Sequence, residues 1–144
     1  MKILHTSDWH LGQTFYNYSR EEEHRAFCAQ LCDIAASEKP DAIVVAGDIF
    51  DVSLPPIGAQ DLLVQMLMHL HSAAPGSVIV VIAGNHDSAT RHEAVNPLWD
   101  AVGIDMIGTV STDDLRHNIV VIPGKGVIGA VPYVNPRFLP EDYF

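Results

Sequence analysis

Acidic, imidazole and amide side chains gather in three short stretches of the sequence. Such groups are typical ligands of hard to borderline divalent metals such as Mn²⁺. A carboxylate can bridge two cations, and two cations about 3.5–4 Å apart suit in-line displacement at phosphorus. The three stretches therefore predict a metal site suited to phosphoryl chemistry. Its candidate residues are Asp8 and His10 in the first stretch, Asp48 and Asp51 in the second, and Asn85, His86 and Asp87 in the third.

Each stretch directly follows a short, mostly apolar run that is typical of a strand. The three runs are Lys2 to Thr6, Ala42 to Val45, and Val78 to Ile82. The run Ala42 to Val45 is continuous and rich in β-branched residues, which indicates a strand that is buried on both faces. In open α/β sheets the chemistry collects at the carboxyl ends of the strands, so we expect the three stretches to meet at one edge.

The segments between these strands carry helical patterns. Ser19 to Glu22 has the S-x-x-E form of a capping box, which predicts a helix that runs to about Ser37. Pro55 and Pro56 precede a second helix. Strand–helix–strand units imply parallel strands with right-handed crossovers. The predicted core-facing residues are Phe27, Leu31, Ile34 and Ala35 in the first helix, and Leu63, Met66, Leu67 and Leu70 in the second.

Beyond Asp87 the sequence predicts only short elements. Residues 97–99 suit a single helical turn, and residues 104–107, 118–122 and 127–131 suit short strands. Glycine or proline separates these segments from one another, and there is no internal repeat or low-complexity segment.

Composition limits the classes of function. The 144 residues are 48% apolar, enough for one domain or part of a larger one, and carry a formal net charge of −10. That charge argues against a general phosphate-backbone binder unless metal ions or a partner offset the repulsion. No apolar run suits a transmembrane helix or a signal peptide. Cys28 and Cys32 lie four apart on a predicted helix, so we expect no disulfide framework and a reducing, cytoplasmic location.

Three ordered motifs carry a family resemblance. D-x-H, G-D-x-x-D and G-N-H-D, in this order at strand ends, resemble the motifs of calcineurin-like metallophosphoesterases. The longer runs ILHTSDWHLGQ, PDAIVVAGDIFD and VVIAGNHDS resemble, within that family, the nuclease subunits of bacterial DNA-repair complexes. The resemblance is strong from Met1 to about Thr90 and continues faintly through residues 131–133 and 136–137. It implies an α/β fold, the N-terminal portion of a two-sheet β-sandwich flanked by helices.

The resemblance also implies cofactors, partners and a reaction. The cofactors would be two divalent ions, Mn²⁺, and the reaction would be exo- and endonucleolytic cleavage of DNA by metal-activated water. The partners would be DNA, a coiled-coil ATPase of the ABC type and a second copy of the chain, with no membrane. By position, Asp8 and His10 would bind the first metal, Asp48 would bridge both metals and Asn85 would bind the second. His86 would act on the scissile phosphate, and Asp87 would orient His86. Asp51 would hold a ligand histidine.

One part of the family pattern is missing. The family needs further histidines, among them a G-H-x-H motif, and this sequence contains no Gly-His dipeptide. The first metal would keep three protein ligands, but the second would keep only Asp48 and Asn85. We therefore expect residues 1–144 to form a metallophosphoesterase domain that is incomplete at its C-terminal end and weak or inactive alone. We also expect strands such as Val78 to Ile82 to be short of partners or to have an exposed face.

Two other functions stay open. One is a phosphatase or cyclic-nucleotide phosphodiesterase of the same superfamily, although the residues after Asp51 lack the arginine that protein phosphatases carry there. The other is a non-catalytic fragment that only folds or dimerises. From residue type alone, Asp51 and Asp87 could equally cap the helices that follow them.

Several further side chains could be mistaken for functional groups. We expect packing for Trp9 and for the shared helix face of His24, Cys28 and Cys32, and surface or packing roles for His92 and His117. Phe15 and Tyr16 could stack on bases or pack within a loop.

Overall fold

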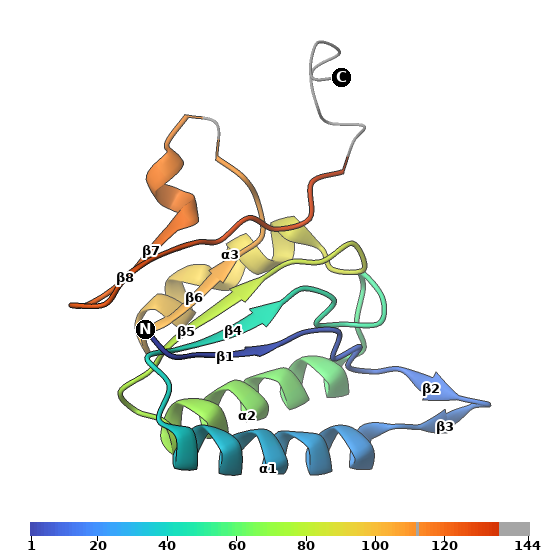
Figure 1. Ribbon diagram of the computed structural model, residues 1–144. Coiled ribbons are helices and arrows are strands. Elements are labelled where there is room, and N and C mark those ends of the chain that lie inside the picture. The colour runs from blue at the N-terminus through green and yellow to red at the C-terminus, as the bar shows by residue number, and fades with distance from the viewer. Residues whose placement is uncertain (112, 136–144) are drawn as a thin grey trace.

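A parallel four-stranded sheet forms the centre of the molecule. The computed structural model describes residues 1–111 and 113–135, so the faint resemblance at residues 136–137 and the end of the predicted domain at 136–144 lie outside the described residues. The strands lie side by side in the order β1-β4-β5-β6, and each neighbouring pair is parallel (Figure 1). Their bounds are β1 Ile3–Thr6, β4 Ala42–Ala46, β5 Val78–Ile82 and β6 Ile104–Ile107.

Helices cover one face of this sheet and bury its main core. They are α1 Glu21–Glu38, α2 Ile57–Ala73 and α3 Ala89–Asp100. In Figure 1, α1 and α2 lie together beneath the strands. Alternate strand residues point into this layer, because successive side chains of a strand face opposite sides. The core includes Ile43, Val45, Ile79 and Val81 from the sheet, and Leu63, Met66, Leu67 and Leu70 from α2 as predicted.

Helix α1 begins later than the capping-box pattern predicts, and the face that it buries differs from the predicted apolar stripe. Arg20 is the N-cap residue without a side-chain cap bond, although the Ser19 hydroxyl accepts a bond from the Glu21 backbone N–H at 3.2 Å. The buried residues are His24, Cys28, Leu31 and Ala35, whereas Phe27 and Ile34 are exposed. The predicted apolar stripe is therefore half wrong, because a histidine and a cysteine take its place in the core.

Helix α3 is a full twelve-residue helix, where the sequence predicted one turn at residues 97–99. Contacts from its side chains to β6 explain the difference. The Asn96 side-chain oxygen accepts a hydrogen bond from Met106 N at 3.0 Å, and the Glu93 carboxylate accepts from Gly108 N at 2.8 Å. Pro97 lies inside the helix, which a local pattern would treat as a helix end.

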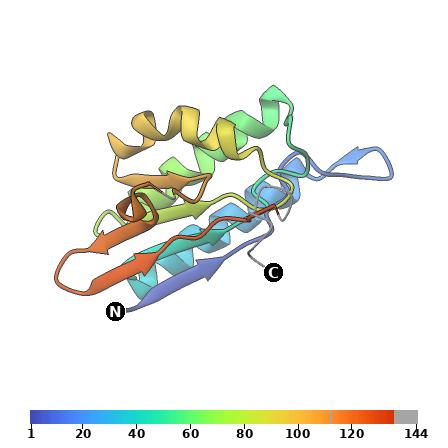
Figure 2. The ribbon, with the colours of Figure 1, turned by 90° about the horizontal axis from the view of Figure 1, so that it is seen from above.

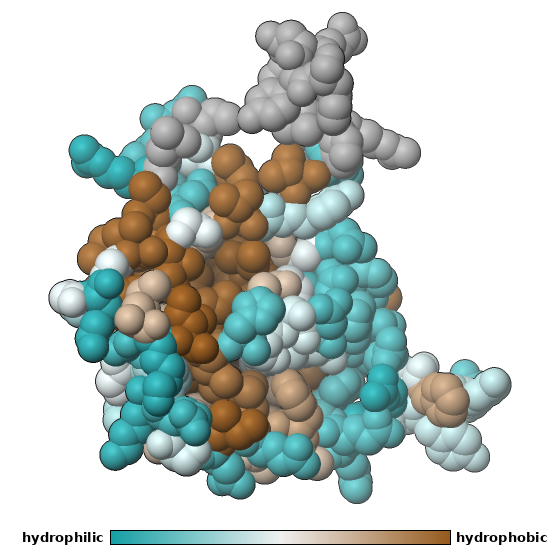
Figure 3. All heavy atoms as spheres, viewed as in Figure 1, coloured by the Kyte–Doolittle hydropathy of each residue, from teal (hydrophilic) through white to brown (hydrophobic). Residues whose placement is uncertain are grey.

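A hairpin lies on the opposite face of the sheet. Its strands are β7 Ile119–Ile122 and β8 Gly126–Gly129, preceded by the 3₁₀ turn Leu115–Asn118 (Figure 2). A second core forms where this hairpin meets β5 and β6, through side chains such as Val80, Ile107, Val120 and Ile122. Figure 3, which has the view of Figure 1, shows apolar side chains on the face toward the viewer, and Val121 and Val127 of the hairpin are exposed. This arrangement confirms the α/β prediction of a parallel sheet flanked by helices.

The expected shortage of partners for Val78 to Ile82 is wrong. This segment is β5, a central strand that pairs with β4 on one side and β6 on the other. Its residues Ile79, Val80 and Val81 are fully buried. The hairpin and the helices cover both faces because each layer packs onto this part of the sheet.

A second small hairpin projects from the opposite end of the molecule in Figure 1. It consists of β2 Thr14–Phe15 and β3 Tyr18–Ser19, which pair antiparallel. It follows the loop that carries His10 and leads directly into α1. The hairpin therefore connects the candidate site to the first helix.

Candidate metal centre

The three predicted stretches meet at one edge of the sheet. Because β1, β4 and β5 are parallel and in register, the loops after them emerge side by side. Hydrogen bonds then join the first two loops: Asp8 N donates to Gly47 O at 3.0 Å and His10 N donates to Asp48 O at 3.0 Å. The chain topology thus places the candidate residues together, as the strand-end argument predicts.

The backbone at this edge adopts an unfavourable conformation at three non-glycine residues. Asp8, His10 and Asp48 have φ values of 55°, 46° and 48°, in the left-handed region. Such residues cost about 1–3 kcal/mol each and persist where the surrounding structure determines them, most often at functional sites. The left-handed backbone aims all three side chains into the space between the loops.

These three side chains form a set of donors that suits a divalent cation. Their ligand atoms lie within 4.8 Å of one another. His10 Nε2 is 3.9 Å from Asp8 Oδ1 and 3.9 Å from Asp48 Oδ2. Two ligand atoms that are each about 2.1 Å from one cation are separated by at most about 4.2 Å, so both distances fit a shared ion. The residues present could therefore hold a metal without a large rearrangement.

Asp48 is held closely by the loop that follows β5. Its Oδ1 atom accepts a hydrogen bond from His86 N at 3.0 Å, which leaves Oδ2 facing His10. Gly84 lies against the same carboxylate, and a Cβ atom at this glycine would stand 2.1 Å from Asp48 Oδ1. Only glycine therefore allows this approach of the two loops.

Asn85 lies beside Asp48 and Asp8 at the rim of a small cavity. This cavity has a volume of about 250 Å³, and Gly84 and Tyr133 also line it. Asn85 is exposed. Tyr133 is fixed next to the cavity by its backbone N–H, which donates to Ala83 O at 2.9 Å.

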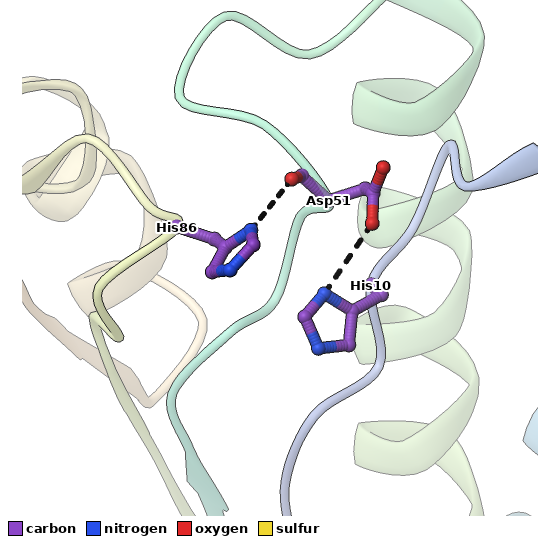
Figure 4. Close-up of side chains that lie close together, drawn as sticks. All are labelled: His10, Asp51 and His86. Carbon is purple, nitrogen blue, oxygen red and sulfur yellow. Dashed lines mark hydrogen bonds and ion pairs between the residues drawn. The ribbon is translucent and has the colours of Figure 1, made fainter.

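Asp51 lies between two imidazole rings (Figure 4). Its carboxylate Oδ1 is 3.6 Å from His10 Nδ1, and its backbone oxygen is 2.7 Å from His86 Nδ1. This contact with the Asp51 carbonyl raises the pKa of His86, burial opposes the rise, and nearby carboxylates add to it. A raised pKa favours the protonated ring, which is the form that can donate a proton.

Asp87 has a different environment from the one that its sequence position suggests. Its side chain is fully buried and accepts hydrogen bonds from the backbone N–H groups of Ile49, Phe50 and Gly84, at 3.1, 2.9 and 2.8 Å. These bonds join the loop after β4 to the loop after β5. In the described part of the chain, none of its hydrogen bonds goes to the His86 ring. The carboxylate therefore holds the backbone of both site loops.

The remaining histidines and cysteines lie outside this centre. His24 and Cys28 are buried in the core as expected, and burial raises the pKa of the Cys28 thiol to about 12, so it stays protonated. His92 is buried 3.9 Å from Asp87, and His117 pairs with Glu93 at 3.2 Å. Trp9 is buried in the core, with its indole N–H donating to Thr6. The expected packing of Trp9, His24 and Cys28 is confirmed, and of the two histidines expected at the surface or packed, His92 is buried and His117 is half-buried.

Sequence reasoning missed two residues beside the site. The Gln13 side-chain amide donates to Asp51 Oδ1 at 3.1 Å, and the Arg20 guanidinium donates to the Gln13 side-chain oxygen. Gln13 is part of the ILHTSDWHLGQ run, but nothing in a local pattern connects it to Asp51, which lies 38 residues further on.

The fold and the site are those of one class of protein, the phosphoesterases. The model of the calcineurin-like phosphoesterase family matches residues 1–138, and the chain belongs to this family. The parallel sheet with acidic and histidine-rich strand ends agrees with that membership.

Three relatives show which members of the family this chain is similar to. The chain is 48% identical to the SbcD subunit of the nuclease SbcCD from Rhodobacter capsulatus, over 97% of this chain and 37% of the relative. It is 41% identical to the corresponding nuclease subunit from Escherichia coli K12, over 95% of this chain and 34% of the relative. It is 37% identical to "DNA double-strand break repair protein Mre11" of Sulfurisphaera tokodaii, over 97% of this chain and 36% of the relative. The chain thus spans about a third of the length of these relatives.

None of the helices in residues 1–111 and 113–135 is both long enough and apolar enough to cross a membrane.

Proposed function

We propose that this chain provides the metal centre of a DNA nuclease that acts in double-strand-break repair, with exo- and endonuclease activity. The observation that carries the proposal is the convergence of Asp8, His10 and Asp48, each in a left-handed backbone, at one edge of the sheet. The names of the relatives, nuclease subunits and a double-strand-break repair protein, support DNA as the substrate.

The donor set supports a two-ion assignment. Asp8, His10 and Asp48 would hold a first divalent ion, which we propose to be Mn²⁺ in keeping with its nitrogen and oxygen ligands. Asp48 and Asn85 would hold a second ion. When bound, the ions supply positive charge that offsets the negative charge of the phosphate. Two donors are few for a fixed geometry at the second position, so we propose that this chain alone cleaves DNA weakly.

His86 and Asp87 serve the reaction in different ways. His86 would donate a proton to the leaving oxygen, because its Nδ1 atom is engaged by the Asp51 carbonyl and its Nε2 atom is left for the substrate. Asp87 would act from behind the site by fixing the backbone of residues 49, 50 and 84. We therefore propose His86 as the catalytic residue and Asp87 as a positioning residue.

DNA would have to approach an acidic chain. The formal net charge of −10 opposes nonspecific phosphate binding, so bound cations and a partner would need to offset the repulsion. The β2–β3 hairpin offers a second means of contact. Phe15, Tyr16 and Tyr18 are 66%, 82% and 78% exposed, and aromatic rings in this position can stack on bases.

A second copy of the chain is a proposed partner. A mostly apolar groove of about 520 Å³ lies between α2 and α3, and its exposed lining includes Val64, Met68, Val95 and Leu98. Packing the same groove of a second copy against it would bury these side chains. Leu98→Glu is then expected to yield a monomer by light scattering, whereas Val121→Glu, on the β7–β8 hairpin, leaves the mass unchanged.

An ATPase is the other proposed protein partner. The relatives are named as subunits of SbcCD, which supports association with a coiled-coil ABC-type ATPase of the SbcC kind. A partner with a positive surface would also offset the formal net charge of −10 of this chain.

The test is a nuclease assay with Mn²⁺ and linear duplex DNA. Asp48→Asn removes the charge of the proposed bridging ligand, and asparagine tolerates the left-handed backbone at this position. Asp33→Asn, an exposed change on α1, is the control. We expect weak cleavage by the wild type and the control, and none by Asp48→Asn. Equal cleavage by all three proteins would contradict the proposal, and hydrolysis of bis-p-nitrophenyl phosphate without DNA cleavage would favour another phosphodiesterase.

A further inference from the structure

His10 presents its two ring nitrogens to different partners. Nε2 faces the carboxylates of Asp8 and Asp48, and Nδ1 faces the carboxylate of Asp51 at 3.6 Å (Figure 4). The Nδ1 atom is buried and has no hydrogen-bond partner among the described residues. An imidazole that binds a cation through Nε2 keeps its proton on Nδ1, and that proton needs an acceptor to fix the ring. The carboxylate of Asp51 is in place to accept it.

Asp51 does not hold this orientation by itself. Its backbone is fixed, because its N–H donates to Leu11 O at 3.2 Å and its carbonyl accepts from His86 Nδ1. Its side chain is 32% exposed, so the carboxylate could turn toward water. The Gln13 amide prevents this by donating to Oδ1 at 3.1 Å, and Oδ1 is the same oxygen that faces His10.

Arg20 determines which way the Gln13 amide points. Its guanidinium donates to the Gln13 side-chain oxygen, so the amide NH₂ group is left to face Asp51. Arg20 is itself fixed at the start of α1, where its Nε donates to Glu23 at 2.7 Å and its backbone N–H donates to Gln13 O at 3.3 Å. A continuous series of polar contacts therefore runs from α1 to the ring of His10.

We propose that Gln13 is a positioning residue of the metal centre, with Arg20 as the group that fixes the direction of its amide. Gln13 acts through Asp51, which in turn orients His10 toward the ion. The proposal rests on metal binding by His10 as set out under the proposed function. Outer partners of this kind typically change metal affinity by about 10–100-fold when they are removed.

The experiment is a calorimetric titration of the metal-free protein with Mn²⁺. Gln13→Met keeps the length of the side chain but removes the amide donor. We expect it to bind Mn²⁺ about 10–100-fold more weakly than the wild type, with an unchanged melting temperature in chelator. Arg20→Ala should weaken binding in the same direction. The matched controls are Gln30→Met and Arg25→Ala on α1, which we expect to bind like the wild type because neither side chain contacts the described site residues.

A double-mutant cycle shows whether Gln13 acts through Asp51. If it does, Asp51→Asn should weaken binding, and adding Gln13→Met to that variant should weaken it no further. Unchanged affinity in Gln13→Met, or full additivity in the double variant, would overturn the positioning role while the proposed function stands. Absence of Mn²⁺ binding in the wild type would instead overturn the proposed metal centre, and this inference with it.

Discussion

Replacing Asp87 with alanine is expected to destabilise the metal-free protein by about 3–5 kcal/mol. Its buried carboxylate accepts three backbone hydrogen bonds, from residues 49, 50 and 84, at 2.8–3.1 Å. A hydrogen bond to a charged group contributes about 1.5–3 kcal/mol, and truncation would leave three donors without a partner. Bonds that share one acceptor group are not additive, so the expected loss is smaller than their sum. It would still be a large share of a domain stability of about 5–15 kcal/mol.

An isosteric change should give an intermediate loss. Oδ2 of Asp87 accepts from Ile49 N and Gly84 N, and Oδ1 accepts from Phe50 N. In Asp87→Asn the amide oxygen can take the position with two donors, and the amide nitrogen then faces the third. One bond is lost, so we expect a destabilisation of about 1.5–3 kcal/mol.

The assay is urea unfolding followed by circular dichroism, in chelator at pH 7.5. The control is Asp8→Asn, because the Asp8 side chain is 65% exposed and asparagine tolerates its left-handed backbone. We expect this control within about 0.5 kcal/mol of the wild type. If Asp87→Ala unfolds at the same urea concentration as Asp8→Asn, the carboxylate does not hold the two loops and the reasoning is refuted.

Two further variants test the loop contact and the buried histidine. Gly84→Ala would place a Cβ atom 2.1 Å from Asp48 Oδ1, so we expect it to weaken Mn²⁺ binding and to lower the free energy of unfolding by about 1–3 kcal/mol. The control is Gly58→Ala, whose Cβ atom would meet nothing within 4 Å and should lower neither quantity. Equal behaviour of the two variants would contradict the close approach of Gly84 to Asp48. Burial lowers the pKa of His92, although Asp87 and Glu93 oppose the shift, so the folded state binds its proton less readily than the unfolded state. Stability should therefore fall as pH drops below about 6.5, by at most about 1.4 kcal/mol per pH unit from this residue. Urea unfolding at pH 7.5 and 5.5 should show a smaller fall in His92→Leu than in the wild type, and an identical fall would contradict this origin.

The strands and their site-bearing ends could be predicted from the sequence because they are specified locally. Two of the predicted strands are continuous apolar runs that end near a glycine, Gly47 or Gly84, where the chain turns, and the first is a shorter apolar segment within residues 2–6. Parallel pairing then brings the three ends together without any further information. The candidate residues Asp8, His10 and Asp48 followed directly from this placement.

Helix α3 and the buried face of α1 depend on contacts that a local pattern does not contain. Bonds from Glu93 and Asn96 to the backbone near β6 hold α3 in place, despite a proline within it. In α1, the spacing of Phe27 and Ile34 predicted a core-facing position, yet both are exposed, while the face of His24 and Cys28 is buried. Tertiary packing determined both results.

Most outer contacts of the site also depend on tertiary structure, although the family resemblance implied one of them, between Asp51 and a ligand histidine. The family resemblance implied that Asp87 orients His86, yet two of the hydrogen bonds that Asp87 accepts come from the loop after β4. Gln13 reaches Asp51 across 38 residues. Such contacts follow from the folded geometry of the loops, where the left-handed backbone of Asp8, His10 and Asp48 decides which side chains meet.

The most direct measurement of the central claim is calorimetric titration of the metal-free wild type and Asp48→Asn with Mn²⁺. Asp48 contributes to both proposed ion positions, and its Oδ2 atom lies 3.9 Å from His10 Nε2. We predict saturable binding to the wild type and an affinity at least about a hundredfold lower in Asp48→Asn, since the loss of a bridging charge removes more than an outer contact would. The same affinity in both proteins would contradict a metal centre at this edge of the sheet.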